Sequence, residues 1–270
     1  MTFGVGGSAV GFYVYNLEEV PISGRRRFNI CSAENEEQLG KQEYERVLQQ
    51  VGNRVLPAWH PSSRMVRRVL DRLIPASGLG DQKWEVHVID APDEMNAFVI
   101  PGGKVFVFSG ILPLCQGDDG LAAVLGHEIA HNVAHHVAEK VSQGVWVFAG
   151  MIILGVMLAT PDWASRAALD LAYQKPGSRA QESEADYIGL MIMAQSCYDP
   201  EAAVGLWQRM EKAEKYAPPQ FISTHPSSHN RIDKIREWLP EAENKRAESD
   251  CVSTLGYAND FKKAFGQVIW

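Results

Sequence analysis

Cysteine is scarce in this sequence, and its few residues are scattered. Cys31, Cys115, Cys197 and Cys251 include no CxxC pair. This pattern excludes a zinc ribbon and a dense disulfide framework, and it leaves room for a single disulfide. Internal repeats and low-complexity tracts are also absent. A composition of 46% hydrophobic and 22% charged residues is ordinary for a globular protein, and 270 residues can bury a sizeable core.

Positive charge is in short supply as well. The net charge is −7, and no long segment concentrates the basic residues. This distribution argues against nucleic acid as a main partner. The one small basic cluster is Arg25, Arg26 and Arg27 within residues 23–30, which we interpret as a turn with a solvated face.

Two apolar segments point toward a membrane. Residues 1–15 carry no charge, but the run is shorter than the roughly 20 residues that span a bilayer. It lacks the basic start of a signal peptide and is not an Arg-rich transit peptide. We therefore expect residues 1–20 to be a partial membrane anchor or an N-terminal segment. Residues 141–159 form the second apolar run, which is either a membrane-associated helix or a buried core helix.

Hydrophobic periodicity predicts an α+β protein that is mostly helical. Apolar residues at helical spacing predict helices over residues 34–56, after Pro61, over 178–196, from Pro200 to about Tyr216, and near the end of the segment 218–239. Alternation predicts strands over 84–90 and on either side of a turn at 101–103. The pattern weakens after Pro240, so we divide the chain into a main domain, 21–240, and a tail, 241–270.

The segment after Asp118 predicts a helix that carries His127, Glu128 and His131 in an HExxH motif. Residues four apart on a helix share one face and lie about 6 Å from each other, so the two imidazoles can bind one zinc ion. Glu128 can then take a proton from an attacking water and pass it to the leaving amine. The motif is typical of metalloproteases; the alternative is an ordinary helix with surface histidines.

A catalytic zinc usually has three protein ligands, so a third must come from elsewhere. On a straight helix His135 would lie about 12 Å from His127 and could not share the metal. Ala134 and Val137 stand where metzincins have a glycine and a third histidine, which excludes that class. We expect His135 and its neighbour His136 to be bystanders or to support a ligand from outside.

The run ESEAD offers a carboxylate on a second helix. Glu182 and Asp186 are four residues apart and face the same way. One of them can bind the metal while the other orients a ligand histidine. Glu184 should point roughly the opposite way. The alternative is an acidic, solvated helix face.

These motifs, with STHPSSHNR at residues 223–231, resemble the membrane-associated zinc gluzincins, the family of HtpX and the CAAX prenyl endopeptidase. Within that family, the segments NLEEVPISGRRRFN, NAFVIPGGKVFVFSGIL, GHEIAH and THPSSHNRI resemble the Oma-type metalloendopeptidases of the mitochondrial inner membrane. The resemblance covers most of residues 16–239. It implies a gluzincin fold with a small sheet and a membrane-associated apolar helix at 141–159.

The resemblance also assigns site residues. It implies one Zn²⁺ per chain with Glu182 as the third ligand and Asp186 as the supporting acid. It places His225 near the metal, where it either stabilises the oxyanion or occupies the open position in a resting enzyme. Arg231 would be structural or would support the oxyanion. Asn96 and Ala97 would bind an extended peptide substrate by strand addition, whereas Phe98 and Ile100 fit a plain core strand equally well.

The function implied is a zinc endopeptidase that cleaves membrane-associated proteins in quality control and stress response at the mitochondrial inner membrane. The sequence leaves open whether the chain forms a homo-oligomer. Two alternatives remain. The first is a catalytically silent scaffold or chaperone-like protein that keeps the zinc fold, against which the intact Glu128 argues. The second is a soluble zinc protease with unrelated substrates, which a protein-covered helix at 141–159 would favour.

Overall fold

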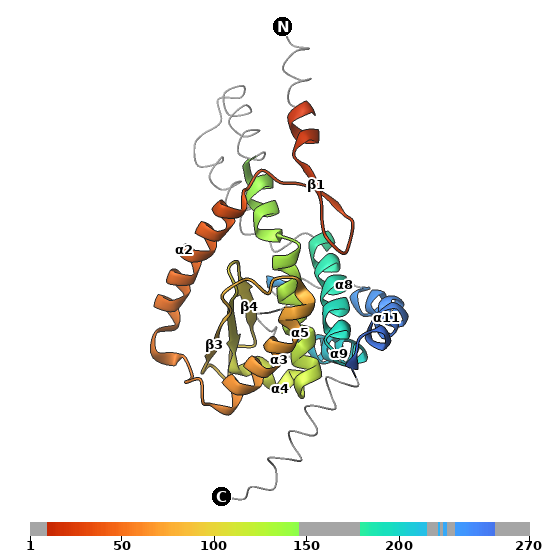
Figure 1. Cartoon of the computed structure of the whole chain (residues 1–270). Helices are drawn as coiled ribbons and strands as arrows, with labels where there is room; N and C mark the ends of the chain where they lie inside the picture. Colours follow the sequence, from red (N-terminus) through yellow and green to blue (C-terminus); the bar gives the residue numbers. More distant parts are fainter. Residues whose placement is uncertain (1–9, 146–178, 215–220, 222–223, 226–229, 252–270) are drawn as a thin grey trace, which may run out of the picture.

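The computed structural model describes residues 10–145, 179–214, 221, 224–225 and 230–251 (Figure 1). Over these residues the protein is mostly helical with two small sheets, as the sequence predicts. Helix α5 (Asp118–Val133) runs through the centre, between the larger sheet and helix α8 (Arg179–Gln195). Helix α11 (Arg231–Glu248) packs on α8, and helix α9 (Glu201–Glu214) packs on α5 and α11.

The larger sheet contains strands β3 (Glu85–Ile89), β4 (Ala97–Ile100) and β5 (Lys104–Phe108), in the order β3-β5-β4. Strand β5 pairs in parallel with β3 and antiparallel with β4, so β4 is an edge strand of this sheet. The predicted strands on either side of the turn at 101–103 are therefore confirmed.

Alternate side chains of the sheet enter two separate cores. Val99, Val105 and Val107 join the main core, which includes apolar residues of α3 and α5. Phe106 and Phe108 face the other way, into a smaller cluster with residues of α2. Because successive side chains of a strand point to opposite faces, the sheet is covered on both sides.

Helices α2 (Ala33–Val51) and α3 (Pro61–Ser77) begin and end at capping residues. Ser32 accepts a hydrogen bond from the Asn35 amide at the start of α2, and α2 stops before Gly52, whose φ is 57°. The prediction that this helix reaches residue 56 was wrong, because the left-handed φ of Gly52 ends the helical hydrogen bonding. Helix α3 begins at Pro61, as predicted.

A glycine pair brings α5 and α8 into backbone contact. A Cβ atom on Gly126 would lie 2.9 Å from the Gly189 carbonyl oxygen, and one on Gly189 would lie 2.7 Å from the His127 amide nitrogen. Both distances are too short for a side chain, so only glycine allows this crossing. The crossing places the first half of α8 beside the HExxH motif of α5.

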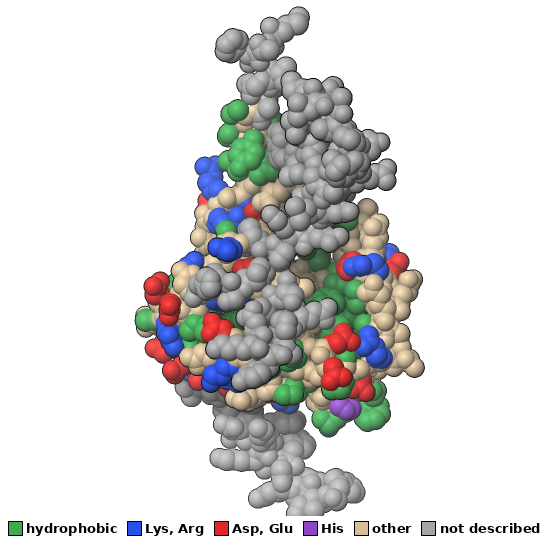
Figure 2. Space-filling model, turned by 180° about the vertical axis from the view of Figure 1, so that it is seen from behind, with side chains coloured by type: hydrophobic (Ala, Val, Ile, Leu, Met, Phe, Trp, Pro, Cys, Tyr) green, Lys and Arg blue, Asp and Glu red, His purple; other side chains and the backbone are tan. Residues whose placement is uncertain are grey.

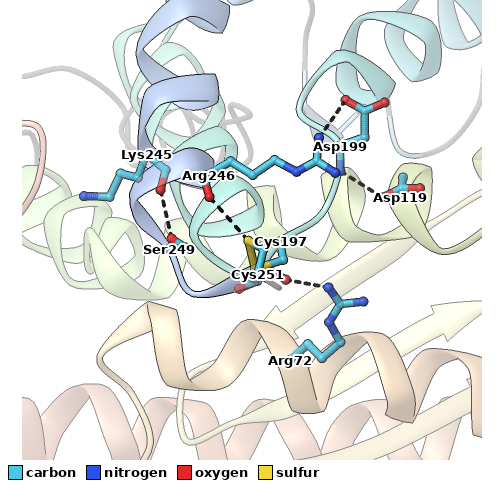
Figure 3. Close-up of a disulfide and its surroundings, with 9 residues drawn as sticks. Arg72, Asp119, Cys197, Asp199, Lys245, Arg246, Ser249 and Cys251 are labelled. Atoms are coloured by element: carbon cyan, nitrogen blue, oxygen red, sulfur yellow. Dashed lines mark hydrogen bonds and ion pairs between the residues drawn. A yellow bond between two sulfur atoms is a disulfide. The ribbon is translucent and has the colours of Figure 1, made fainter. Parts of the chain in front are cut away.

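The C-terminal part of the described chain is held by a disulfide between Cys197 and Cys251 (Figure 3). Cys197 follows α8, Cys251 follows α11, and Arg72 of α3 donates to the carbonyl of Ser196 beside the bond. Cys31 and Cys115 are free thiols. Helix α11 continues through Pro240 to Glu248, so it extends into the segment that the sequence pattern sets apart as a tail.

The second sheet is a hairpin of β1 (Leu17–Glu19) and β2 (Arg26–Phe28). It lies at one end of α8 (Figure 1). The interpretation of its basic residues as a solvated face was wrong for two of the three. Arg27 is buried and pairs with Glu18, and Arg25 pairs with two glutamates of the main domain; Arg26 is exposed.

The two apolar segments lie partly outside the described residues. Residues 141–145 belong to a helical segment over 136–145, whereas 146–159 and 1–9 are not described. Within the described ranges, no helix combines the length and the apolar character needed to cross a membrane. Apolar side chains are exposed where the described chain starts (Figure 2); they are Val10, Phe12, Tyr13, Val14 and Tyr15.

Candidate metal centre

Four side chains converge beside the crossing of α5 and α8. His127 and His131 come from α5, Glu182 from the first turn of α8, and His225 from the segment before α11. One donor atom of each lies within 4.8 Å of all the others, and we call these four side chains the donor cluster. Among the residues proposed from the sequence as metal ligands, His127, His131 and Glu182 therefore meet in one place.

The spacing of these donor atoms suits a single ion. The Nε2 atoms of His127 and His131 are 3.1 Å apart, and Glu182 oxygens lie 3.4 and 3.7 Å from them. The Nδ1 atom of His225 lies 3.3 Å from the Nε2 of His127. Two ligands about 2.0–2.1 Å from one tetrahedral ion are about 3.4 Å apart, so the nitrogen and carboxylate donors present fit a tetrahedral metal site.

The protonation of these groups also favours metal binding. Burial, together with the charge of the nearby His127, lowers the pKa of His131 well below its ordinary value. A neutral imidazole is the form that binds a metal. Burial alone would raise the pKa of Glu182, but hydrogen bonds from His127 and His225 lower it far below its ordinary value. The site therefore holds a carboxylate anion next to a neutral imidazole.

Glu128 lies inside this site without belonging to the donor cluster. Its side chain is buried, and no described residue forms a hydrogen bond with its Oε1 atom. Burial raises its pKa to about 7, against the opposing effect of His225. A carboxylate with a pKa near neutrality is suited to accept and return a proton, which is the task of a general base.

Asp186 contacts the ring nitrogen of His127 that does not face the other ligands. Its Oδ1 atom lies 2.9 Å from the Nδ1 of His127, and it accepts a hydrogen bond of 2.5 Å from Arg231. The guanidinium of Arg231 lies over the Trp207 ring, 3.3 Å from the ring centroid. Asp186 and Arg231 thus fix the orientation of His127, while Arg231 itself is held by an aromatic face.

The two histidines after the motif behave differently from each other. Helix α5 ends at Val133, and a turn with His135 at φ 46° separates it from the helical segment 136–145. His135 contacts Glu36 of α2 and lies away from the donor cluster. His136 instead returns to the site, with its Nδ1 atom 2.7 Å from the Nδ1 of His131. The assumption of one straight helix was therefore wrong.

Glu184 is outside the donor cluster but is not exposed. Its Oε2 atom lies 2.9 Å from the Nε2 of His136. Hydrogen bonds from His136, Arg25 and Ser23 outweigh the effect of burial and lower its pKa to about 2. Helical spacing does not predict this contact, because His136 and Glu184 lie 48 positions apart and no glycine marks the turn at His135.

Asn96 and Ala97 lie at the start of the edge strand. Both are buried, and the Oδ1 of Asn96 accepts a hydrogen bond from the amide of Ala97. The carbonyl of Asn96 accepts from the Phe108 amide. The amide of Phe221 donates to the neighbouring Met95 carbonyl, and Phe221 stacks on His225, which links this strand to the donor cluster.

A buried HExxH helix that meets a carboxylate from a second helix defines the site of a metallopeptidase. Comparison with known proteins agrees. The sequence model of Peptidase family M48 matches residues 61–239. The chain belongs to this family, and it is a metalloendopeptidase whose substrates are proteins.

Its relatives include mitochondrial enzymes of fungi and animals. The chain is 51% identical to "Mitochondrial metalloendopeptidase OMA1" of Schizosaccharomyces pombe, over 89% of this chain and 72% of the relative. It is 38% identical to the protein of the same name in Saccharomyces cerevisiae, over 93% and 77% of the two chains. Identity to "Metalloendopeptidase OMA1, mitochondrial" of Homo sapiens is 34%, over 90% of this chain and 49% of that protein.

Proposed function

We propose that this protein is a zinc endopeptidase of the mitochondrial inner membrane that cleaves membrane-associated proteins in quality control and stress response. The observation that carries the zinc peptidase assignment is the convergence of His127, His131 and Glu182 around one point, with buried Glu128 beside it. The mitochondrial setting is supported by the relatives, whose names place them there.

His127, His131 and Glu182 hold one Zn²⁺ per chain in this proposal. When bound, the ion supplies Lewis-acid chemistry, polarising the scissile carbonyl and making a water easier to deprotonate. Glu128 takes the proton of the attacking water and later gives it to the leaving amine. Asp186 holds the tautomer and orientation of His127, and Arg231 neutralises the charge of Asp186.

His225 serves as a cap on the resting site. Its Nδ1 atom lies in the donor cluster, 3.1 Å from Glu182 Oε2, and its Nε2 atom faces Glu128. In this position the imidazole fills the place that a peptide carbonyl and its attacking water would need. The alternative is that His225 stabilises the oxyanion, which requires its ring to move out of the donor cluster.

Substrate binds along the edge strand β4. Beyond the end of β4 lies a cavity of about 710 Å³, which is lined by α2, by the Pro101–Gly102 turn that follows the strand, and by Asn132, which follows His131. An extended peptide added to β4 would pass from this cavity toward the donor cluster. We assign Asn96 and Ala97 to that contact; the Asn96 side chain must rotate to free the Ala97 amide.

We further propose that residues 1–20 and 141–159 contact the membrane, the first preceding a peptidase domain over 21–240 and the second forming an apolar insertion within that domain. The exposed apolar side chains of residues 10–15 support the first contact, since exposed apolar groups in a row are typical of interaction surfaces. For the second, support comes from the uncharged composition of 141–159. Residues 146–159 lie outside the described structure.

A comparison of protein N-termini in mitochondria tests this function. Mitochondria that contain the wild-type enzyme should show new N-termini in inner-membrane proteins, and mitochondria with Glu128→Gln should lack them. A silent scaffold predicts identical sets of N-termini. Cleavage restricted to soluble matrix proteins would support a soluble protease with unrelated substrates.

A further inference from the structure

The metal-facing histidine His131 is connected to the N-terminal hairpin by a continuous chain of contacts. Its Nδ1 atom lies 2.7 Å from the Nδ1 of His136, and the Nε2 of His136 lies 2.9 Å from Glu184. Glu184 in turn accepts hydrogen bonds from Ser23 and from the Nε of Arg25, at 2.8 Å for the latter. The chain therefore ends on the turn between β1 and β2.

The direction of each hydrogen bond follows from the chemistry of its ends. Glu184 as a carboxylate only accepts, so the Nε2 of His136 must donate. The Nδ1 of a neutral His136 is then an acceptor, so the Nδ1 of His131 donates to it. This leaves the Nε2 of His131 without a proton, and that atom is the one that faces Glu182 and His127. This series of hydrogen bonds therefore selects the tautomer of His131 that leaves its Nε2 atom free to bind a metal.

The arrangement repeats the support of the other histidine. His127 is held by Asp186, and Asp186 by Arg231. His131 is held by Glu184 through His136, and Glu184 by Arg25. Each metal-facing imidazole is thus backed by a carboxylate of α8 that an arginine neutralises. The difference is that Arg231 lies within residues 61–239, whereas Arg25 lies outside the part that the family model matches.

Arg25 is held firmly enough to play this role. Its Nη1 and Nη2 atoms donate to both oxygens of Glu139, at 2.9 and 2.6 Å, while Nε serves Glu184. Glu139 and Glu184 are both buried. Two buried carboxylates without a cation would carry a large desolvation cost. The guanidinium of Arg25 offsets that cost by donating to both of them.

We propose that the β1–β2 hairpin completes the metal centre: Ser23 and Arg25 hold Glu184, and Glu184 fixes His131 through His136. These four are positioning residues, because none of them touches the metal-facing atoms. The inference rests on the proposed function, in which His131 binds Zn²⁺. It assigns the N-terminal hairpin to the working peptidase rather than to a linker.

The test measures metal affinity of the full chain by chelator competition, with Co²⁺ as a spectroscopic probe. Arg25→Gln should weaken metal binding by roughly 10–100-fold, the range for groups that support a ligand, and should alter the visible Co²⁺ bands. Arg25→Lys keeps the charge but not the fork, and should recover part of the affinity. Arg26→Gln, at an exposed site of the same hairpin, is the matched control and should leave affinity unchanged.

Further variants separate the possible failures. If Arg25→Gln does not fold, Ser23→Ala removes one hydroxyl only and should still weaken binding by a few fold. Wild-type affinity and Co²⁺ bands in folded Arg25→Gln, or in Ser23→Ala where Arg25→Gln does not fold, would overturn the inference. Glu182→Gln separates failure of the proposed function from failure of the inference. If Glu182→Gln also keeps wild-type metal affinity, the proposed function fails. If Glu182→Gln abolishes metal binding while the hairpin variants leave it unchanged, only the inference about the hairpin fails.

Discussion

The Nε2 atom of His225 lies 3.3 Å from the Oε1 of Glu128, while the Nδ1 atom of the same ring lies 3.1 Å from the Oε2 of Glu182. One imidazole therefore stands between the proposed base and a proposed ligand. We have proposed that a substrate carbonyl and its attacking water need the same space. On that proposal the arrangement is that of a resting enzyme, whose site must open before it works.

His225→Ala should therefore raise basal peptidase activity, because it removes the group that fills the open position. The measurement is kcat and KM on a peptide substrate at saturating zinc. If His225 instead stabilises the oxyanion, kcat should fall at nearly constant KM, because the activation free energy would rise by about 2–4 kcal/mol. Unchanged kinetics would contradict both roles and make His225 a turn residue before Pro226.

The carboxylates of α8 should differ in their effect on metal affinity. Glu182→Gln should reduce zinc affinity most, because a neutral amide is a poor ligand. Asp186→Asn should weaken binding by roughly 10–100-fold, since Asp186 only orients His127. Isothermal titration with a competing chelator measures both. A stronger effect from Asp186→Asn than from Glu182→Gln would reverse the assignment of ligand and support.

Helical spacing directs Glu184 away from Glu182 and Asp186, and on that ground alone Glu184→Gln should have only a mild effect. Its buried contact with His136 changes that expectation. Glu184→Gln should now weaken metal binding measurably, though less than Glu182→Gln. A variant indistinguishable from wild type would show that the contact with His136 does not matter for the site.

Glu85, on strand β3 and outside the donor cluster, gives the stability of the protein a pH dependence. Hydrogen bonds from Lys104 and Tyr44 lower its pKa from 4.5 to about 2. A depressed pKa in the folded state means that the stabilisation is complete above the unfolded pKa and is lost as pH falls from about 4.5 to about 2.

Denaturant unfolding at several pH values checks this linkage. The stability difference between wild type and Glu85→Gln should be largest above pH 4.5 and should shrink toward pH 2. Glu45→Gln, an exposed site on α2, serves as the control. A difference that stays constant across this range would refute the proposed linkage.

The disulfide between Cys197 and Cys251 should stabilise the folded chain. It closes a loop with a sequence separation of 54 residues, for which a cross-link contributes about 2–4 kcal/mol. Cys251→Ser should lose that amount in non-reducing buffer, and the loss should vanish when dithiothreitol is present. Cys31→Ser removes a free thiol and should have little effect. Equal stability of wild type and Cys251→Ser without reductant would show that the bond does not form.

The sequence predicts those features of the fold that depend on local periodicity. Strands β4 and β5 around the turn at 101–103, and helix α3 from Pro61, follow from alternation and helical spacing. The end of α2 was placed too late, because the left-handed conformation of Gly52 is not apparent from hydrophobic spacing. Helix α11 likewise continues through Pro240, where packing overrides the local preference.

The candidate site shows the same division. The i,i+4 spacing of His127 with His131, and of Glu182 with Asp186, predicts which side chains share a face, and these side chains meet. His136 could not be found that way, because the backbone turns at His135. The part played by Arg25 depends on a contact between positions 159 residues apart, for which spacing along the chain carries no information.

The most direct test of the account is Glu128→Gln, measured for zinc content and peptide turnover on the same preparation. In the proposed mechanism Glu128 moves protons, and it is not part of the donor cluster, so the variant should hold about one zinc per chain and lose most of its turnover. Full zinc content with near wild-type turnover would contradict the endopeptidase mechanism proposed for this site.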